Sequence, residues 1–519
     1  MSAKVMVSNL SALKAKYGLS RRNEIIKVAK ELYAADKAQG LKTTLVDVSD
    51  ATAMQKLGGR QVSDPASGQQ NKRAVDAIYC ALKPDYLVLV GGPDVIPHIA
   101  LQNPLPDDGD SSVPGDLPYA CEAPYSLIIK DFIGPTRVVG RLPDIAGARD
   151  PAYLLNLLRT VAERGSRSAS DYAAFLGLSA KVWEDSTRTS LRQLFGPTAT
   201  PHLSPPEGPE WTPQQLAALS HFINCHGAPA DHRYYGQKGN SYPVAHDAAW
   251  VEGKLAKGTV VAAECCYGAQ LYDPALDDDK LASLAITYLG NAAYGFFGST
   301  TIAYGPASGN GGADLICQYF LKRVLQGASL GRAALEARQE FAQGAWALNP
   351  TDLKTLGQFD LLGDPSVHPV QKAPTHLKAL GKAGAGMSAE QRDEAAARAS
   401  RRRMLFEKGL AIAQTQPVAQ WEREPQRSVS LERAIGRLLR ENHLAGAEVA
   451  SYRVVLPSAR SLGSKSAAAA VHGPVPPATT FHVALQRGVE GPGGITRCTA
   501  LIAEERDGQL ASYRVLVSR

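Results

Sequence analysis

Short apolar runs alternate with stretches of helical spacing through the middle of the chain. Tyr86–Val90 and residues 259–263 have the length and β-branched content of buried strands, and residues 313–326 carry apolar side chains at the spacing of a helix. Strands of four to eight residues that alternate with amphipathic helices are typical of a mostly parallel sheet with helices on both faces. The sequence therefore predicts an α/β fold between residues 80 and 370.

The pattern is different before and after this region. Residues 1–80 are predicted to be mostly helical, with one strand at residues 43–49. Beyond residue 371 the sequence is rich in Gly, Ala and Lys, which is typical of a linker. Ser388 and Gln391 then form a capping box, which predicts the start of a helix.

Near residue 507 the pattern indicates a β-hairpin. Asp507-Gly508 lies between two apolar stretches, and this dipeptide favours the tight turn that joins antiparallel strands. We therefore expect four parts along the chain: an N-terminal α/β subdomain (1–165), a second α/β subdomain (166–370), a linker helix (371–415) and an α+β or β-rich C-terminal domain (416–519).

Composition narrows the class of protein. The chain has 519 residues, 44% of them apolar and 20% charged, so it is globular and too long for one ordinary core. Its net charge of +6 is mild, and its basic residues are mixed with acidic ones, so we predict no nucleic-acid partner. We see no export signal and no run near the ~20 apolar residues of a spanning helix, which predicts a cytoplasmic protein without membrane contact.

Seven cysteines, an odd number, favour reduced thiols over a disulfide framework. Small buried cysteines are common in protein cores. We apply that interpretation to four of the seven: Cys80, Cys121, Cys317 and Cys498.

Two predicted strands end in reactive side chains followed by glycine. One apolar run leads to His226-Gly227, and the next leads to Cys265-Cys266-Tyr-Gly268. Functional groups gather beyond the carboxyl ends of parallel strands. A thiol becomes a nucleophile when it loses its proton, and a nearby imidazole assists that step. The glycines leave room for a substrate backbone, so the pattern predicts a Cys-His pair for acyl transfer.

Further motifs occur in a fixed order around this pair. Together with the His-Gly and Cys-x-Gly strand ends they resemble the caspase-like superfamily of cysteine peptidases, most closely its gingipain-type family, over roughly residues 80–370. The resemblance implies two stacked α/β subdomains, the second of which carries the catalytic pair, and it implies no cofactor or metal. The motifs are YLVLVGGPDVIP (86–97), GDLPYA (115–120), VVGRLPD (138–144) and FDLLGDPSVHPV (359–370).

The resemblance leaves two candidates for the nucleophile. The Cys-x-x-Gly setting of gingipain-type enzymes would select Cys265, whereas the caspase setting Gln-Ala-Cys-Arg-Gly aligns with residues 264–268 and selects Cys266. We choose Cys266, because a small residue usually precedes the nucleophile and Glu264 would fit poorly there. Cys265 stays the alternative.

The resemblance also suggests two acidic site residues. A Glu before the catalytic subdomain can orient the histidine, and Glu163 stands at that point; the alternative is a solvated Glu at a helix end. The loop after the first catalytic strand helps to bind the residue before the scissile bond. There Asp185, or secondly Glu184, would select Arg or Lys by a charge-assisted contact, unless Asp185 is only a helix N-cap.

Two charged segments carry weaker expectations. Arg398 and Arg401–Arg403 lie between the catalytic part and the tail, where the enzyme itself or an upstream activating peptidase would cut to switch activity on; the alternative is a charged helix face. The acidic run at 273–280 lacks the spacing of an EF-hand, so we interpret it as a solvated loop rather than a calcium loop or an acidic wall.

We therefore predict a cysteine endopeptidase that performs limited proteolysis on protein or peptide substrates after Arg or Lys. Gingipain-type enzymes are typically secreted, whereas this sequence indicates a cytoplasmic one. Two rivals stay open. One is an inactive caspase-like binding protein that acts through its tail, and the other is a Cys-His amidase for a non-protein substrate.

Overall fold

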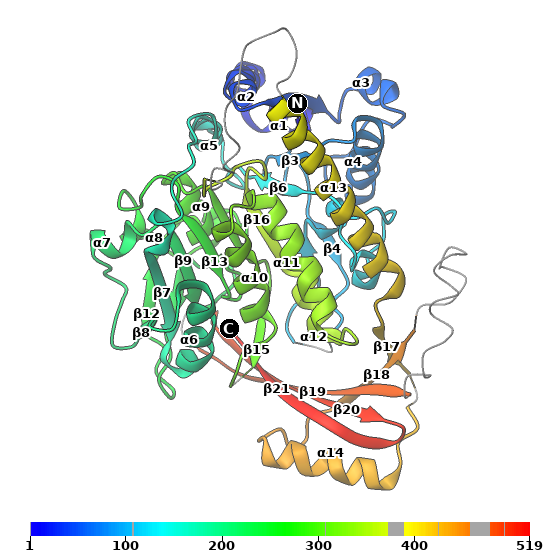
Figure 1. Cartoon of the computed structure of the whole chain (residues 1–519). Helices are drawn as coiled ribbons and strands as arrows, with labels where there is room; N and C mark the ends of the chain where they lie inside the picture. Colours follow the sequence, from blue (N-terminus) through cyan, green and yellow to red (C-terminus); the bar gives the residue numbers. More distant parts are fainter. Residues whose placement is uncertain are drawn as a thin grey trace.

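The centre of the molecule is one ten-stranded sheet (Figure 1). The structure is a computed structural model, and it describes residues 2–105, 108–306, 308–371, 389–423, 425–456, 478–491 and 494–519. The strand order is β2-β1-β3-β6-β16-β14-β13-β9-β7-β8. Neighbouring strands are parallel except β14 and β16. The bounds are β1 Ser2–Ser8, β2 Leu41–Asp47, β3 Tyr86–Val90, β6 Val139–Leu142, β7 Phe175–Ala180, β8 His202–Ser204, β9 Ser220–Asn224, β13 Val260–Ala263, β14 Gly295–Ser299 and β16 Phe359–Gly363.

Helices cover this sheet in two groups. Helices α6, α10, α11 and α12 pack together on one face, and α2, α5, α8 and α9 form a second connected layer. Apolar side chains from both groups close a continuous core with the strands. The predicted α/β class is thus confirmed. The helix bounds are α1 Leu10–Tyr17, α2 Leu19–Ala38, α3 Ala51–Lys56, α4 Gly68–Leu82, α5 Ala152–Ala162, α6 Glu184–Phe195, α7 Pro213–Leu216, α8 Ala248–Val251, α9 Leu284–Gly290, α10 Ala313–Leu325, α11 Leu330–Gly344, α12 Pro350–Gln358, α13 Ala389–Thr415 and α14 Val429–Glu441.

A separate antiparallel sheet lies near the C-terminal end (Figure 1). Its order is β15-β21-β20-β19-β18-β17, and α14 packs on it through Leu431, Ile435 and Leu438. Asp507 and Gly508 adopt the left-handed backbone that the tight turn between β20 and β21 requires, so the predicted hairpin is confirmed. The bounds are β15 Tyr304–Pro306, β17 Val418–Glu422, β18 Val449–Val455, β19 Thr479–Glu490, β20 Thr496–Arg506 and β21 Gln509–Ser518.

Two small sheets complete the strands. β4 (Ile99–Leu101) pairs with β5 (Val113–Gly115). β10 (His226–Gly227) pairs with β11 (Arg233–Tyr235), which pairs with β12 (Val244–Asp247). The second of these sheets begins at one of the predicted reactive strand ends.

The sequence analysis did not predict the first strand of the chain, β1. β1 lies inside the sheet between β2 and β3, although its sequence, SAKVMVS, is short and contains a lysine. The Lys4 side chain is fully buried, and its ammonium group pairs with Asp36 at 2.7 Å and with Asp364 at 2.6 Å. A lysine interrupts the apolar pattern by which a core strand is recognised, and its burial is possible here only because two carboxylates pair with it.

The two predicted α/β parts share the central sheet. Strands from residues 1–165 join those from 166–370 where β6 pairs with β16. The boundaries between the four parts stay predictions. Most of the predicted linker, and Ser388 of the capping box, lie outside the described residues. Among the described helices, none combines the length and the apolar character that crossing a membrane requires.

Candidate active site

The two reactive strand ends lie beside each other at one edge of the central sheet. β9 leads to His226, and its parallel neighbour β13 leads to Glu264, Cys265 and Cys266. A side chain on Gly227 would overlap the carbonyl oxygen of Cys266, so the two backbones touch. Glycine at position 227 is therefore a packing requirement, and it brings the His-Gly and Cys-Cys segments together.

The two neighbouring cysteines have different surroundings. The Cys265 sulfur is fully buried and lies 4.0 Å from the carbonyl oxygen of Ile223 on β9. The Cys266 sulfur accepts a hydrogen bond from the amide of Ala303 at 3.3 Å, in the loop that follows β14. Burial raises the pKa of the Cys266 thiol to about 12, although the Ala303 amide favours the thiolate. In this state the Cys266 thiol is protonated.

The His226 ring packs against Trp183 and Tyr242, and one of its two nitrogens has a hydrogen-bond partner among the described residues. Its Nε2 lies 2.7 Å from Oε1 of Gln237, whose amide donates to the Gly239 carbonyl and to the Tyr242 hydroxyl. Since the Gln237 oxygen accepts, Nε2 carries the proton and Nδ1 is left with its lone pair. Within the described part of the chain, the buried Nδ1 has no hydrogen-bond partner. Burial lowers the pKa of His226 to about 4, so the imidazole is neutral.

A segment from the far end of the chain contacts both halves of the pair. The main-chain oxygen of Arg519 accepts hydrogen bonds from the amides of Cys266, at 3.2 Å, and Gly227, at 3.5 Å. The Arg519 amide donates to the Ala303 carbonyl at 3.0 Å. The preceding residues, Leu516–Ser518, pair antiparallel with β15. A main-chain oxygen of this chain therefore lies between the two strand ends.

The Arg519 side chain is buried in a site that we call the arginine site, made by Trp183, Gly305, Pro306 and Asp314. Its Nη2 lies 2.9 and 3.1 Å from the two carboxylate oxygens of Asp314 and donates to the Pro306 carbonyl at 3.2 Å. The guanidinium carbon lies 4.5 Å from the centre of the Trp183 ring. A side chain on Gly305 would overlap the guanidinium, so glycine leaves the space that the arginine fills.

Asp314 is fixed by groups other than Arg519. It stands in the first turn of α10 and accepts hydrogen bonds from the Ser186 hydroxyl at 3.0 Å and from the Gly311 amide at 3.2 Å. The neighbouring Glu264 is fully buried, and burial together with Asp314 raises its pKa well above the usual range. Glu264 is therefore protonated, and Asp314 supplies the negative charge that faces the guanidinium.

The acidic residues predicted from the resemblance lie elsewhere. Asp185 is exposed in the first turn of α6, and it is not the N-cap, which is Trp183. Glu184 pairs with Arg188 and Lys181 on the same stretch of chain.

Glu163 lies at the end of α5. Its side chain is 69% exposed, and its carboxylate pairs with Lys257 at 2.9 Å. The group on the His226 ring nitrogen is Gln237, so the structure does not bring Glu163 to the histidine through any contact of the described residues.

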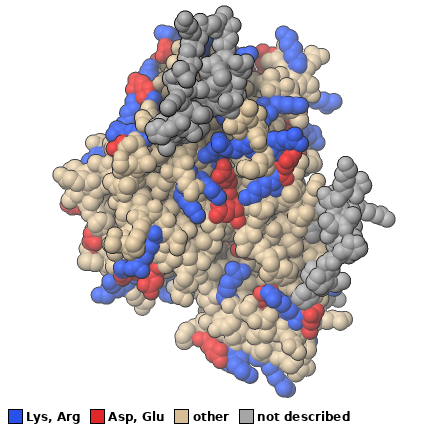
Figure 2. Space-filling view, in the orientation of Figure 1, with Lys and Arg blue, Asp and Glu red and all other residues tan. Residues whose placement is uncertain are grey.

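The Arg-rich segment is part of α13, which packs on the body through Leu405 and Ile412. Arg402 donates to the Lys83 carbonyl and pairs with Asp85 at 3.0 Å. Peptidases bind extended backbone, so cutting here would require this helix to unwind. Lys and Arg gather in the upper half of the face in Figure 2, with acidic side chains between them. Arg398, Arg401 and Arg402 line a cavity of about 590 Å³.

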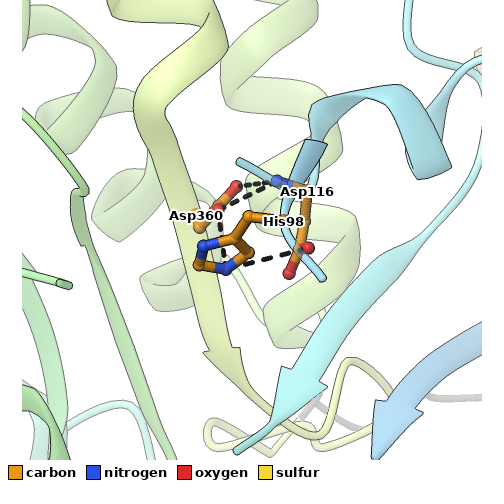
Figure 3. Close-up of side chains that lie close together, drawn as sticks. All are labelled: His98, Asp116 and Asp360. Atoms are coloured by element: carbon orange, nitrogen blue, oxygen red, sulfur yellow. Dashed lines mark hydrogen bonds and ion pairs between the residues drawn. The ribbon is translucent and has the colours of Figure 1, made fainter. Parts of the chain in front are cut away.

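Two clusters of described residues have the ligand spacing of a metal site. The first joins His98, Asp116 and Asp360 (Figure 3), with His98 Nε2 at 3.9 Å from Asp116 and 3.7 Å from Asp360. Arg141 forms a bidentate pair with Asp116, at 2.6 and 2.8 Å, and Arg338 lies 3.2 Å from Asp360. Each carboxylate thus already faces a cation, and ion pairing accounts for this cluster.

The second cluster involves the acidic run at 273–280. His232 Nδ1 lies 2.8 Å from Asp277, which is buried, and Asp231 completes the group. Asp277 also accepts hydrogen bonds from the amides of Asp279 and Leu281, and Asp279 pairs with Arg233. These contacts fasten the loop to β11. The run is therefore a packed loop at Asp277, and the expectation of a wholly solvated loop was wrong there.

Three contacting residues escaped the sequence analysis: Trp183, Gln237 and Asp314. Trp183 lies in the segment that was expected to build the specificity site, two positions before Asp185. Gln237 follows the short β10–β11 hairpin that returns the chain to His226. Asp314 follows a Gly-rich stretch at the start of a predicted helix, where an acid is common without any function. Only Trp183 had a signal nearby.

The comparisons with known proteins give little beyond this geometry. No protein-family model and no curated protein matches the chain. A solved structure described as "Structure of Protease" aligns with a TM-score of 0.48 and 11% sequence identity, over 99% of this chain and 96% of that chain.

Proposed function

We propose that the chain is a caspase-like cysteine endopeptidase that cleaves after arginine, with Cys266 as the nucleophile and His226 as the proton acceptor. One observation carries the proposal. The Arg519 carbonyl is bound by the Gly227 and Cys266 amides while its side chain fills the arginine site. This is the arrangement that an acyl-transfer site needs for the carbonyl of its substrate.

The amides of Gly227 and Cys266 mark the place where the carbonyl group of a substrate would bind. Two N–H groups that point to one carbonyl oxygen stabilise the negative charge that develops when a nucleophile adds to the carbon. One of them belongs to Cys266, whereas Cys265 lies against β9. This contrast supports Cys266 as the nucleophile and Cys265 as a core residue.

The reaction follows from these contacts. Cys266 gives its proton to Nδ1 of His226, and its sulfur adds to the carbonyl carbon of the substrate residue in the arginine site. The oxyanion is held by the Gly227 and Cys266 amides. The C–N bond then breaks, and the imidazolium returns the proton to the leaving amine. Water hydrolyses the thioester, which releases the new carboxylate and restores the thiol.

The specificity for arginine rests on Asp314. A guanidinium binds a carboxylate with directed hydrogen bonds and stacks on an aromatic ring, and the site offers both through Asp314 and Trp183. We therefore assign the acidic specificity residue to Asp314 in place of Asp185. Lysine has one compact ammonium group that cannot use the ring as fully, so we expect arginine to be preferred.

The test uses peptides with Arg, Lys, Asp or Leu before a fluorogenic leaving group. Wild type should hydrolyse the Arg peptide fastest, and C266S should lower kcat/KM by about 10⁴-fold or more, since it removes the attacking thiol. C265S is the matched control, with less than about 3-fold change, because a conservative replacement at a site away from the reaction costs little.

Two results would overturn the proposal. One is hydrolysis that survives C266S and is lost in C265S. The other is a protein without Ser518 and Arg519 in which Cys266 reacts with iodoacetamide no faster than in the same protein with H226A, as the rival of an inactive binding protein predicts.

A further inference from the structure

The segment Leu516–Arg519 occupies the position of a bound peptide. Its residues follow one another in an extended strand, and the last of them presents both its carbonyl oxygen and its side chain to the candidate site. If the site cleaves after arginine, then Arg519 stands where the residue before the scissile bond would bind. Ser518, Val517 and Leu516 then stand at the three preceding positions.

This occupant excludes a second peptide. The edge of β15 bonds to the segment through the register Tyr304–Ser518, Gly305–Val517 and Pro306–Leu516. An extended substrate that adds a strand to β15 would need the same backbone groups. Substrate and segment therefore cannot bind together.

The segment is held from its other side as well. Leu516 and Val517 pair with Ala500 and Thr499 on β20. The Ser518 hydroxyl accepts from the Cys498 amide at 2.8 Å and donates to the Thr496 carbonyl at 3.0 Å. These bonds fix the segment before it enters the site, so it binds without the entropy loss of a free peptide.

The occupied site is also in an unreactive protonation state. The Cys266 thiol and the His226 imidazole are both neutral here, because burial disfavours thiolate and imidazolium alike. The Arg519 guanidinium further lowers the pKa of His226. A vacated site would admit water, which stabilises both charged forms.

We propose that Leu516–Arg519 is a built-in inhibitor, which keeps the peptidase latent until this segment leaves β15 and the arginine site. The inference rests on the proposed function and adds its regulation. The chain would become active when a partner, a competing substrate or a change in the C-terminal sheet withdraws the segment. The inhibition needs no covalent step, since occupancy alone blocks the amides of Gly227 and Cys266.

The experiment compares three proteins, each as the full chain. R519E places a carboxylate against Asp314 and should expel the segment. R514A removes a positive charge from an exposed position of the same strand and serves as the matched control. A third protein that lacks Ser518 and Arg519 repeats the test if R519E perturbs β21.

Two readouts are measured for each protein. The first is hydrolysis of an Arg peptide, which should rise about 10²-fold in R519E, as loss of a tethered competitor predicts, and stay within about 2-fold in R514A. The second is the rate at which iodoacetamide alkylates Cys266, followed by mass spectrometry, which should rise in parallel. Added acetyl-Leu-Val-Ser-Arg should slow both readouts in R519E.

The outcomes separate the two claims. Equal hydrolysis and equal alkylation in wild type, R519E and the shortened protein would overturn the inhibitor and leave the peptidase standing. Faster alkylation of Cys266 without hydrolysis in any of the proteins would support occupancy of the site and overturn the peptidase. Alkylation that rises as much in R514A would show that β21 acts on the site only through its packing, which also overturns the inhibitor.

Discussion

Two buried clusters of the molecule contain the same kinds of side chain in different arrangements. One is His98 with Asp116 and Asp360, and the other is the set of groups around Arg519: His226, Glu264 and Asp314. Each combines a neutral histidine with two buried carboxyl groups. They differ in the origin of the arginine that faces the acids.

In the first cluster the arginines belong to the body. Arg141 lies on β6 and Arg338 on α11, and Arg141 makes four hydrogen bonds of 2.6–2.9 Å, two to Asp116 and one each to Gly91 and Ile96. Although burial opposes ionisation, Arg141 keeps the pKa of Asp116 below its usual value. A network whose members all stand on the central fold is a permanent part of the structure.

In the second cluster the arginine comes from the last strand. Arg519 reaches Asp314 from β21, and its Nε and Nη1 have no hydrogen-bond partner among the described residues. The His226 Nδ1 is unpartnered in the same sense. The first cluster has such atoms too, His98 Nε2 and Arg338 Nε, so the two clusters differ in the element that supplies the arginine and not in how fully their groups are bonded.

The largest expected difference between the clusters is in stability. R141M leaves Asp116 buried without its cation and should lower the free energy of unfolding by about 3–5 kcal/mol, the usual cost of breaking a buried pair. R519M should cost less than about 1 kcal/mol, because the segment can leave and water can reach Asp314. Urea unfolding followed by circular dichroism measures both. A similar loss of unfolding free energy in R141M and R519M would mean that Arg519 is as permanent a part of the structure as Arg141.

The next difference concerns the substrate. In the protein that lacks Ser518 and Arg519, D314N removes the charge that faces the substrate guanidinium and should lower kcat/KM for an Arg peptide by about 100-fold, about 2.7 kcal/mol. Hydrolysis of a citrulline peptide of the same length should change little, since citrulline carries no charge. D185N is the matched control and should keep the wild-type preference. Loss of Arg preference in D185N would return the specificity residue to α6.

The smallest expected difference between the clusters is in the pKa of their histidines. Burial lowers the pKa of both His98 and His226 to about 4. His98 is buried by the body, whereas the charge of Arg519 adds to the effect of burial and lowers the pKa of His226 further. Deleting Ser518 and Arg519 should therefore raise the pKa of His226 toward its usual 6.5 and leave His98 unchanged.

Titration by NMR of ¹³C-labelled histidine measures this shift, with H98Q and H226Q to assign the two signals. The proton affinity of His226 should rise on deletion because water stabilises the imidazolium. A His226 signal that still titrates near pH 4 in the shortened protein would mean that the body buries this histidine by itself.

The local pattern was sufficient for much of the fold. The runs at Tyr86–Val90 and 259–263 became β3 and β13, and the Asp507-Gly508 turn became the β20–β21 hairpin. These features depend on apolar content, strand length and turn chemistry, which neighbouring residues specify. β1 was missed because the partners of Lys4, Asp36 and Asp364, lie far away in the sequence.

The sequence alone determined that His226 and the Cys265-Cys266 pair end neighbouring strands, because parallel strands deliver their carboxyl ends to one edge. Sequence reasoning preferred Cys266 over Cys265 only through the resemblance, and it did not connect Asp314, Gln237 and Arg519 to that edge. Those connections depend on contacts between residues up to 336 positions apart, such as Arg519 and Trp183. Only tertiary packing decides them, since a pattern of nearby residues carries no information on which distant charge will fill a buried site.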